Sequence, residues 1–185
     1  MFKLAFNIGL FPNVKCNGDV RVIQSLNIRG QGEIILGRSC SLGFYPSPNM
    51  YRGECYLEAR HPNSKLIIGD RVFINNNAVV IADKSIIVIG DDTLIGPNFL
   101  CIGSNLHPLN PAKRLTNEYQ CKPIYIGKNV FIGANVTILQ GVTIGDNSVI
   151  AAGTTIHSNI PANTVVKLDS MNIKLSKEGA NKSLI

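Results

Sequence analysis

The side chains best suited to acid–base chemistry near neutral pH are the three histidines, His61, His107 and His157. His107 stands at the entrance of the polar, proline-containing stretch 104–123. A histidine at the base of a long insertion is well placed to act as a general base, so we interpret His107 as catalytic. His61 lies in the turn-like segment 60–64 and is interpreted as structural. His157 follows an inward-facing isoleucine, so its side chain is expected to face outward.

The sequence offers no covalent nucleophile to accompany this base. It contains no Gly-x-Ser-x-Gly turn and no phosphate-binding glycine-rich loop that ends in Lys-Ser or Lys-Thr. A zinc site of three histidines is also disfavoured, because the histidines are widely dispersed along the chain. A single base suits direct transfer, in which His107 takes a proton from an acceptor hydroxyl or amine that attacks an activated acyl group. Backbone N–H groups at sharp corners could stabilise the resulting oxyanion.

The scaffold that must position this base is indicated by a sequence period of six. Aliphatic residues recur at this spacing, usually followed by glycine or another small residue, at Ile126, Ile132, Ile138, Ile144, Ile150 and Ile156. Neither a helix nor an ordinary strand has this period. Six residues can form one flat side of a coil, and three sides complete one turn of a triangular prism. The sequence therefore predicts an all-β solenoid, a parallel β-helix with aliphatic side chains along its axis and small residues that let the backbone turn.

We expect a single domain over residues 1–185. Residues 1–33 are expected to form an irregular lead-in, residues 34–166 the β-helix, and residues 167–185 a short helix or tail. The repeat disappears between residues 104 and 123 although it is strong on both sides. A long loop inside a compact domain usually marks function, and an insertion at a corner of the prism leaves the stacked strands intact.

The chain carries a net charge of +6. This charge fits either a solvated, lysine-rich surface or attraction to an anionic ligand such as a phosphorylated cofactor. No dense stripe of basic residues interleaved with aromatic residues is present, so nucleic-acid binding is not expected.

Cysteine usage and hydropathy indicate a cytoplasmic protein. The five cysteines include no Cys-x-x-Cys pair, which argues against zinc binding and a disulfide framework. Cys40 and Cys101 occupy repeat positions and are expected in the core. No segment approaches the roughly 20 apolar residues of a membrane span, and residues 1–11 lack the cleavage site of a signal peptide. The apolar side chains of residues 1–11 could cap the open end of the solenoid or contact a membrane surface peripherally, and both interpretations remain open.

Together, these motifs resemble the hexapeptide-repeat acyltransferases with a left-handed parallel β-helix, in particular the galactoside, maltose and surface-polysaccharide O-acetyltransferases. The resemblance covers about residues 65–166, and the matching segments are 89–98, 107–110, 122–134, 138–153 and 160–166. Segments 40–48 and 57–60 look more like the capsule and O-antigen modifying members. The resemblance implies transfer of an acetyl group from acetyl-CoA, without a metal, to a sugar hydroxyl of a bacterial surface polysaccharide or its precursor.

The resemblance also implies roles for residues near the acceptor. His107 matches the catalytic base of the family. Asn77 matches a position that contacts the acceptor sugar, with an asparagine ladder along one corner as an equal alternative. Phe131 stands where the family often has an aromatic residue beside the loop or the acceptor.

Cofactor contacts follow from the same resemblance. Ala134 and Ala152 match positions whose backbone contacts acetyl-CoA. His157 and Ser158 stand where a Thr-Lys pair commonly contacts the cofactor, so a fixed positive charge is lost in this chain. Lys167 could replace part of that charge.

The family assembles as trimers with each active site between two prisms, so the resemblance implies a homotrimer in which the loop of one subunit covers the cofactor groove of its neighbour. Two alternatives remain open. The same chemistry could act on a small sugar, a nucleotide-amino sugar or an antibiotic, through a hydroxyl or an amine. The chain could also be a non-catalytic β-helix assembly module.

Overall fold

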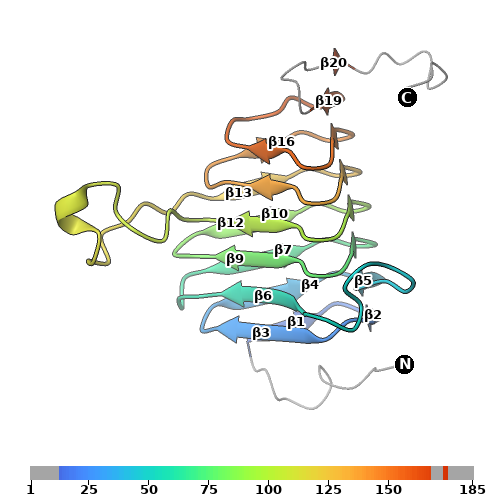
Figure 1. The fold of residues 1–185 in the computed structure, drawn as a ribbon. Coiled ribbons are helices and arrows are strands. Elements are labelled where there is room, and N and C mark those ends of the chain that lie inside the picture. Colours follow the sequence, from blue (N-terminus) through green and yellow to red (C-terminus); the bar gives the residue numbers. More distant parts are fainter. Residues whose placement is uncertain (1–12, 168–172, 175–185) are drawn as a thin grey trace.

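The computed structural model describes residues 13–167 and 173–174. In this part of the chain, short strands wind around a triangular prism, so that each strand pairs with an equivalent strand one coil away (Figure 1). The three faces are sheets of parallel strands, which confirms the predicted left-handed parallel β-helix. No helix among the described residues is long and apolar enough to cross a bilayer.

The chain visits the three sheets in turn. The first sheet contains β1 (Val14–Cys16), β4 (Glu33–Leu36), β7 (Lys65–Ile68), β10 (Ile86–Ile89), β13 (Ile124–Ile126) and β16 (Thr143–Ile144). The second contains β2 (Val20–Val22), β5 (Cys40–Leu42), β8 (Phe73–Ile74), β11 (Leu94–Ile95), β14 (Phe131–Ile132), β17 (Val149–Ile150), β19 (Thr164–Val166) and the antiparallel β20 (Ile173–Lys174). The third contains β3 (Leu26–Gly30), β6 (Cys55–Ala59), β9 (Val79–Ala82), β12 (Leu100–Ile102), β15 (Thr137–Ile138) and β18 (Thr155–Ile156).

The core is a set of aliphatic columns that run along the prism axis. In the first sheet, one column of register partners is fully buried and consists of Ile34, Leu66, Ile87 and Ile124. Cys101 continues a similar column between Val80 and Ile138 in the third sheet. Cys40 and Cys101 are both buried, as expected for core residues, and burial raises the pKa of the Cys101 thiol.

At the corner between the first and second sheets, a glycine follows the last aliphatic residue of β4, β7, β10, β13 and β16. Glycine is required there because successive coils stack closely on one another. A Cβ on Gly90 would lie 2.6 Å from the carbonyl carbon of Gly127 in the next coil. The left-handed turn itself is made two residues later, by Asp92 (φ 60°) and Asn129 (φ 53°) in these two coils. The expectation that the small residue makes the turn therefore needs correction. Glycine allows the backbones of two successive coils to touch, and the polar residue two positions later changes the chain direction.

The structure differs from the expected irregular lead-in over residues 13–33. Strands β1, β2 and β3 form a complete coil that pairs in register with β4, β5 and β6. Asn17 replaces the usual small residue after the apolar strand position, so the six-residue signature is weak although the strand alternation is retained. The proposed cap or membrane contact of residues 1–11 and most of the tail 167–185 lie outside the described residues.

Two insertions leave corners of the prism (Figure 1). The shorter one connects β5 to β6. The longer one connects β12 to β13, projects far from the prism, and contains a short 3-10 helix, Pro111–Lys113. It leaves the corner between the third and first sheets, in agreement with the loop predicted for residues 104–123.

A leucine pair tests the assignment of the core. Leu66 is completely buried, whereas Leu115 in the long loop is fully exposed at 100%. We expect Leu66→Ala to lower the free energy of unfolding by about 2–5 kcal/mol, because it removes buried methyl groups and leaves a cavity. Leu115→Ala is the matched control and should change stability by less than about 0.5 kcal/mol. Denaturant unfolding followed by circular dichroism measures both, and equal effects would contradict the assigned core.

Candidate active site

The long loop that carries His107 leaves the prism through a narrow neck. Ser104 and Cys121 form an antiparallel bridge. On either side of this bridge, the backbone N–H of Asn105 donates to the carbonyl of Gln120 at 3.1 Å, and that of Lys122 donates to Gly103 at 3.0 Å. These bonds tie the outgoing and returning limbs together, so the loop has an ordered root.

His107 lies just beyond this neck and is exposed. Its backbone N–H donates to the carbonyl of Asn105 at 2.7 Å. Its ring Nδ1 lies 3.0 Å from the carbonyl oxygen of Arg114, on the other side of the loop. Because a carbonyl can only accept, this contact assigns the proton of the neutral imidazole to Nδ1 and leaves the Nε2 lone pair free to take up a proton.

The tip of the loop is held by its own polar contacts. Asn110 caps the 3-10 helix, since its side chain accepts from the backbone N–H of Ala112 at 3.0 Å. Lys113 and Glu118 form an ion pair at 2.6 Å between exposed side chains. The carbonyl of Arg114, which contacts His107, therefore belongs to a segment with defined internal structure.

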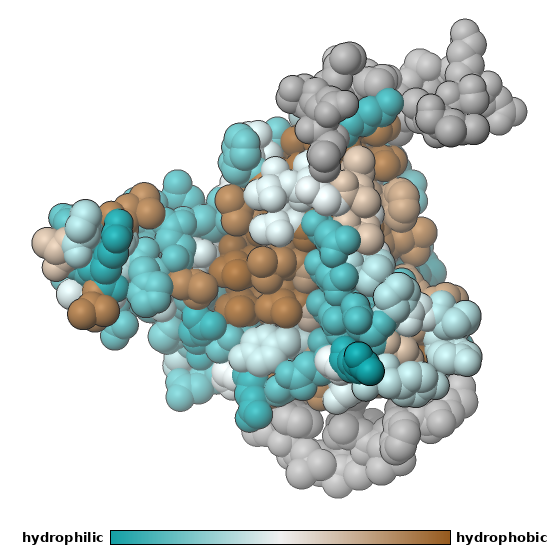
Figure 2. Space-filling model, in the orientation of Figure 1, coloured by the Kyte–Doolittle hydropathy of each residue, from teal (hydrophilic) through white to brown (hydrophobic). Residues whose placement is uncertain are grey.

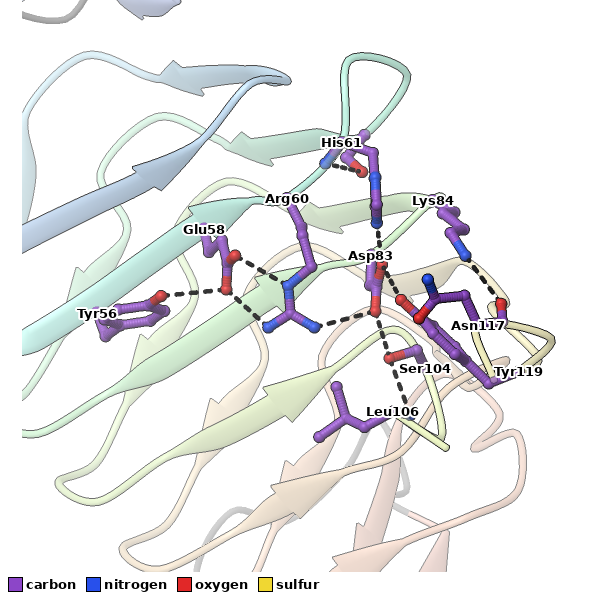
Figure 3. Close-up of polar contacts among 11 residues, drawn as sticks. Tyr56, Glu58, Arg60, His61, Asp83, Lys84, Ser104, Leu106, Asn117 and Tyr119 are labelled. Atoms are coloured by element: carbon purple, nitrogen blue, oxygen red, sulfur yellow. Dashed lines mark hydrogen bonds and ion pairs between the residues drawn. The ribbon is translucent and has the colours of Figure 1, made fainter. Parts of the chain in front are cut away.

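Beneath the neck lies a fully buried carboxylate, that of Asp83 (Figure 3). Its Oδ2 accepts from the Ser104 hydroxyl at 2.9 Å and from Arg60 Nη1 at 3.1 Å. Its Oδ1 accepts from the Tyr119 hydroxyl at 3.3 Å and lies 3.2 Å from Nε2 of His61. The His61 contact lacks hydrogen-bond geometry, so it is electrostatic and depends on protonation of the imidazole. Four neighbours thus surround a carboxylate with about four lone-pair sites.

Arg60 joins Asp83 to a second acidic side chain. It donates through Nε and Nη2 to the two oxygens of Glu58, both at 2.9 Å, and Tyr56 donates to Glu58 at 3.2 Å. The hydrogen bonds that Arg60 donates to the Glu58 carboxylate raise the pKa of Arg60. Because a buried charge is costly without a partner, this bidentate pairing stabilises the whole cluster.

The Asp83 cluster is not among the features expected from the sequence, in which His61 is interpreted as structural without a partner. A signal is nevertheless present. Ala59 pairs with Ala82, and Ile81 pairs with Ile102, so Arg60, Asp83 and Ser104 occupy equivalent positions on three successive coils. A polar residue repeated at one corner position on successive coils indicates a stacked polar cluster.

Asn77 lies at the corner between the second and third sheets and takes part in a ladder of side-chain amides. Its Nδ2 donates to Asn98 at 3.3 Å, and Asn98 donates in turn to Asn135 at 3.0 Å. Its Oδ1 accepts from Gln24 at 3.1 Å. These contacts agree with the asparagine-ladder interpretation, while the role of Asn77 in acceptor binding remains a prediction.

The other candidate residues fall into two groups. Ala134 and Ala152 lie at the corner that contains Asn77, and Gly153 N–H donates to the Ala134 carbonyl at 2.8 Å. His157 and Ser158 are exposed and lie together at the other end of the third-sheet strands. This is the corner from which the loop of His107 projects. Within one chain, the width of the third sheet separates the two groups.

The described residues contain no group of three or more His, Cys, Asp or Glu side chains that could hold a metal ion. The site offers the imidazole of His107 on an ordered loop, flanked by the exposed corner residues His157 and Ser158. Acyl transfer to a hydroxyl needs such a base together with a site for the acyl donor.

Comparisons with known proteins agree with this geometry. Residues 123–158 match the family model described as hexapeptide repeat of succinyl-transferase. The chain is 42% identical over 102 residues to galactoside O-acetyltransferase of Escherichia coli K12, an alignment that covers 55% of this chain and 49% of that protein. These matches confirm the resemblance to hexapeptide-repeat acetyltransferases.

Solved structures give the same result. A hexapeptide-repeat acetyltransferase of Vibrio cholerae, complexed with acetyl coenzyme A, aligns with a TM-score of 0.50 and 44% identity over 55% of this chain and 54% of that chain. A maltose O-acetyltransferase from Clostridium difficile 630 aligns with a TM-score of 0.58 and 25% identity over 90% of this chain and 72% of that chain. The chain spans about half the length of the curated relatives it matches, namely 51%, 49% and 55% of three of them.

The left-handed backbone of Asn77 (φ 61°) gives a test of its structural role. Asn77→Gly and Asn77→Ala remove the same amide contacts, but only alanine is strained at this φ. We expect the alanine variant to be less stable than the glycine variant by about 1 kcal/mol. Asn75 has no positive φ, so the order should reverse there, with glycine less stable by about 0.5–1 kcal/mol. Thermal and denaturant unfolding of the four variants decide, and the same order at both positions would contradict the assigned turn at Asn77.

Proposed function

We propose that this protein is an acetyl-CoA-dependent O-acetyltransferase that acts on a sugar hydroxyl of a bacterial surface polysaccharide or its precursor. The observation that carries the proposal is the environment of His107. Its Nδ1 faces the carbonyl of Arg114, and its Nε2 remains free on an exposed, ordered loop. A nearly neutral hydroxyl requires such a base, because it is a weak nucleophile until its proton is removed.

The proposed reaction is a direct transfer. Nε2 of His107 takes the proton of the acceptor hydroxyl as its oxygen attacks the thioester carbonyl of acetyl-CoA. The tetrahedral oxyanion collapses, the C–S bond breaks, and the thiolate of CoA leaves with the proton from the imidazolium. The products are the acetyl ester and free CoA. The Arg114 carbonyl fixes the ring orientation throughout and stabilises the transient imidazolium through its Nδ1–H.

Donor and acceptor assignments are supported by similarity and by charge. The V. cholerae relative binds acetyl coenzyme A, and the E. coli and C. difficile relatives are named for galactoside and maltose acceptors. A net charge of +6 favours an anionic donor such as a CoA thioester. Ala134, Ala152, His157 and Ser158 are the proposed cofactor contacts, and Asn77 is the proposed acceptor contact.

We further propose a homotrimer with active sites between subunits. The second sheet presents an outward column of register partners, Phe73, Leu94, Phe131 and Val149, in which Leu94 and Phe131 are 49% and 51% exposed. The third sheet presents a different apolar patch over β9 and β12, formed by the partly exposed Val79, Leu100 and Ile102 and continued by Leu139 after β15 (Thr137–Ile138) (Figure 2). Two unlike apolar faces on one prism can bury each other in a closed ring of identical subunits.

A trimer also offers a way to complete the active site, because two chains can bring together corner residues that one chain holds apart.

The five cysteines are free thiols, which supports the proposed cytoplasmic location. Peripheral association with the inner face of the membrane remains part of this proposal.

Two histidine variants test the assigned chemistry. We expect His107→Ala to lower kcat for acceptor-dependent CoA release by about 10²-fold or more, the scale of a lost general base. His157→Ala is the matched substitution at the same corner and should raise KM for acetyl-CoA while kcat stays within about twofold. The assay is thiol release from acetyl-CoA with a panel of sugars, nucleotide sugars and lipid-linked glycans.

An unchanged kcat for His107→Ala would contradict the proposed base. A loss of only a few-fold would point to an amine acceptor, which needs a base less than a hydroxyl does. Absence of acetyl-CoA binding by calorimetry would instead favour the assembly-module alternative.

The proposed trimer is tested by a charge on the apolar column of the second sheet. We expect Phe131→Lys to convert the trimer to monomers at micromolar concentration, because burying an unpaired ammonium in an apolar interface is costly. Tyr125→Lys places the same charge on the first sheet, where the native side chain is 43% exposed, and should leave the trimer intact. Analytical ultracentrifugation gives the masses, and a monomeric wild-type protein would refute the proposal.

A further inference from the structure

Leu106, the residue directly before His107, has an unusual backbone conformation. Twelve non-glycine residues of the described chain have positive φ, and eleven of them are asparagine, aspartate, serine, lysine or arginine. Leu106 (φ 61°) is the one aliphatic residue among them. A bulky side chain in this region is strained, and such strain persists only where neighbouring contacts hold the backbone in place.

The contact that holds Leu106 comes from Ser104. The backbone N–H of Leu106 donates to the Ser104 hydroxyl oxygen at 3.3 Å. The same hydroxyl donates to Oδ2 of Asp83 at 2.9 Å. An ionised carboxylate can only accept, so Asp83 fixes the direction of the serine proton and keeps a serine lone pair available for the Leu106 N–H. In Figure 3 these groups form a continuous chain from the buried carboxylate to the loop.

The returning limb of the loop is bound to the same corner. Tyr119 donates to Oδ1 of Asp83 at 3.3 Å, and the Lys84 ammonium lies 4.2 Å from the centre of the Tyr119 ring. Lys84 also donates to the carbonyl of Asn117 at 3.3 Å. A single buried carboxylate therefore contacts both limbs of the loop that carries His107.

We propose that Asp83 and Ser104 are positioning residues that hold Leu106 in its left-handed conformation and thereby aim His107 at the acceptor hydroxyl. This inference rests on the proposed function, since it assigns the cluster a role in setting the base. It also explains why a charged group is buried at this corner. A misplacement of the base by about 1 Å can reduce the rate about 10²-fold, so a fixed root for the loop has a direct catalytic consequence.

Two serine variants of the full-length protein test the proposal. Ser104→Ala removes the link between Asp83 and Leu106 but leaves Asp83 paired with Arg60. Ser85→Ala is the matched control, because it makes the same substitution at this corner, in the segment that connects β9 to β10. The Ser85 hydroxyl is buried and has no hydrogen-bond partner among the described residues. Hydrogen–deuterium exchange of peptides covering residues 104–122 reports on the loop without requiring activity. We expect exchange to accelerate about tenfold in Ser104→Ala and to remain at the wild-type rate in Ser85→Ala.

The kinetic prediction separates positioning from general stability. Ser104→Ala should lower kcat about tenfold or more while KM for acetyl-CoA stays within about twofold. Leu106→Asn should then recover part of kcat in the Ser104→Ala background, because asparagine adopts the left-handed conformation more readily than leucine. A role limited to stability would give no such recovery.

Unchanged exchange in Ser104→Ala, or equal acceleration in Ser85→Ala, would overturn the proposal whatever the activity of the protein. Normal kcat in Ser104→Ala with a catalytically essential His107 would also overturn it. If instead His107→Ala retains full activity, the proposed function fails while the exchange data still decide whether Asp83 and Ser104 fix the loop.

Discussion

The stacking of one coil directly on the next is the constraint on which the rest of this structure depends. Adjacent strands in a sheet lie about 4.8 Å apart, and at the corners the backbones approach so closely that a Cβ on Gly90 would overlap the next coil. Residues separated by one coil of sequence thus become direct neighbours. Each column of the prism must therefore suit one environment along its whole length, whether aliphatic, amide or charged.

Asp83 shows what this constraint makes possible at a corner. A carboxylate placed inside the aliphatic columns would have no partners and would be strongly destabilising. At the corner, Arg60 on one neighbouring coil and Ser104 on the other meet it directly, and the root of the long loop supplies Tyr119. The stacking of coils therefore excludes polar groups from the axis but supplies hydrogen-bond partners for them where the chain turns. The rigid scaffold and the ordered loop of His107 both result from this stacking.

The fold is largely predictable from the sequence because its signal is repeated. The aliphatic residues from Ile126 to Ile156 specify the period, and the missing repeat between residues 104 and 123 locates the insertion. The first coil escapes recognition, because Asn17 replaces the small residue at the corner although the strands keep their alternation of apolar and polar residues. The Asp83 cluster escapes it for a different reason: Arg60, Asp83 and Ser104 lie far apart in the sequence and become neighbours through strand register, which depends on where each corner gains or loses a residue.

The placement of the candidate residues argues that a single prism does not hold a complete site. His107, His157 and Ser158 lie where the third-sheet strands end, whereas Asn77, Ala134 and Ala152 lie where they begin. The face between these two edges carries an apolar patch bordered by more hydrophilic residues (Figure 2), and one sheet face alone would enclose neither a thioester nor a sugar. A second prism packed against that face would supply the missing wall and bury the apolar surface. The interaction that stabilises the assembly would then also exclude water from the reacting groups, which strengthens every hydrogen bond to the developing oxyanion.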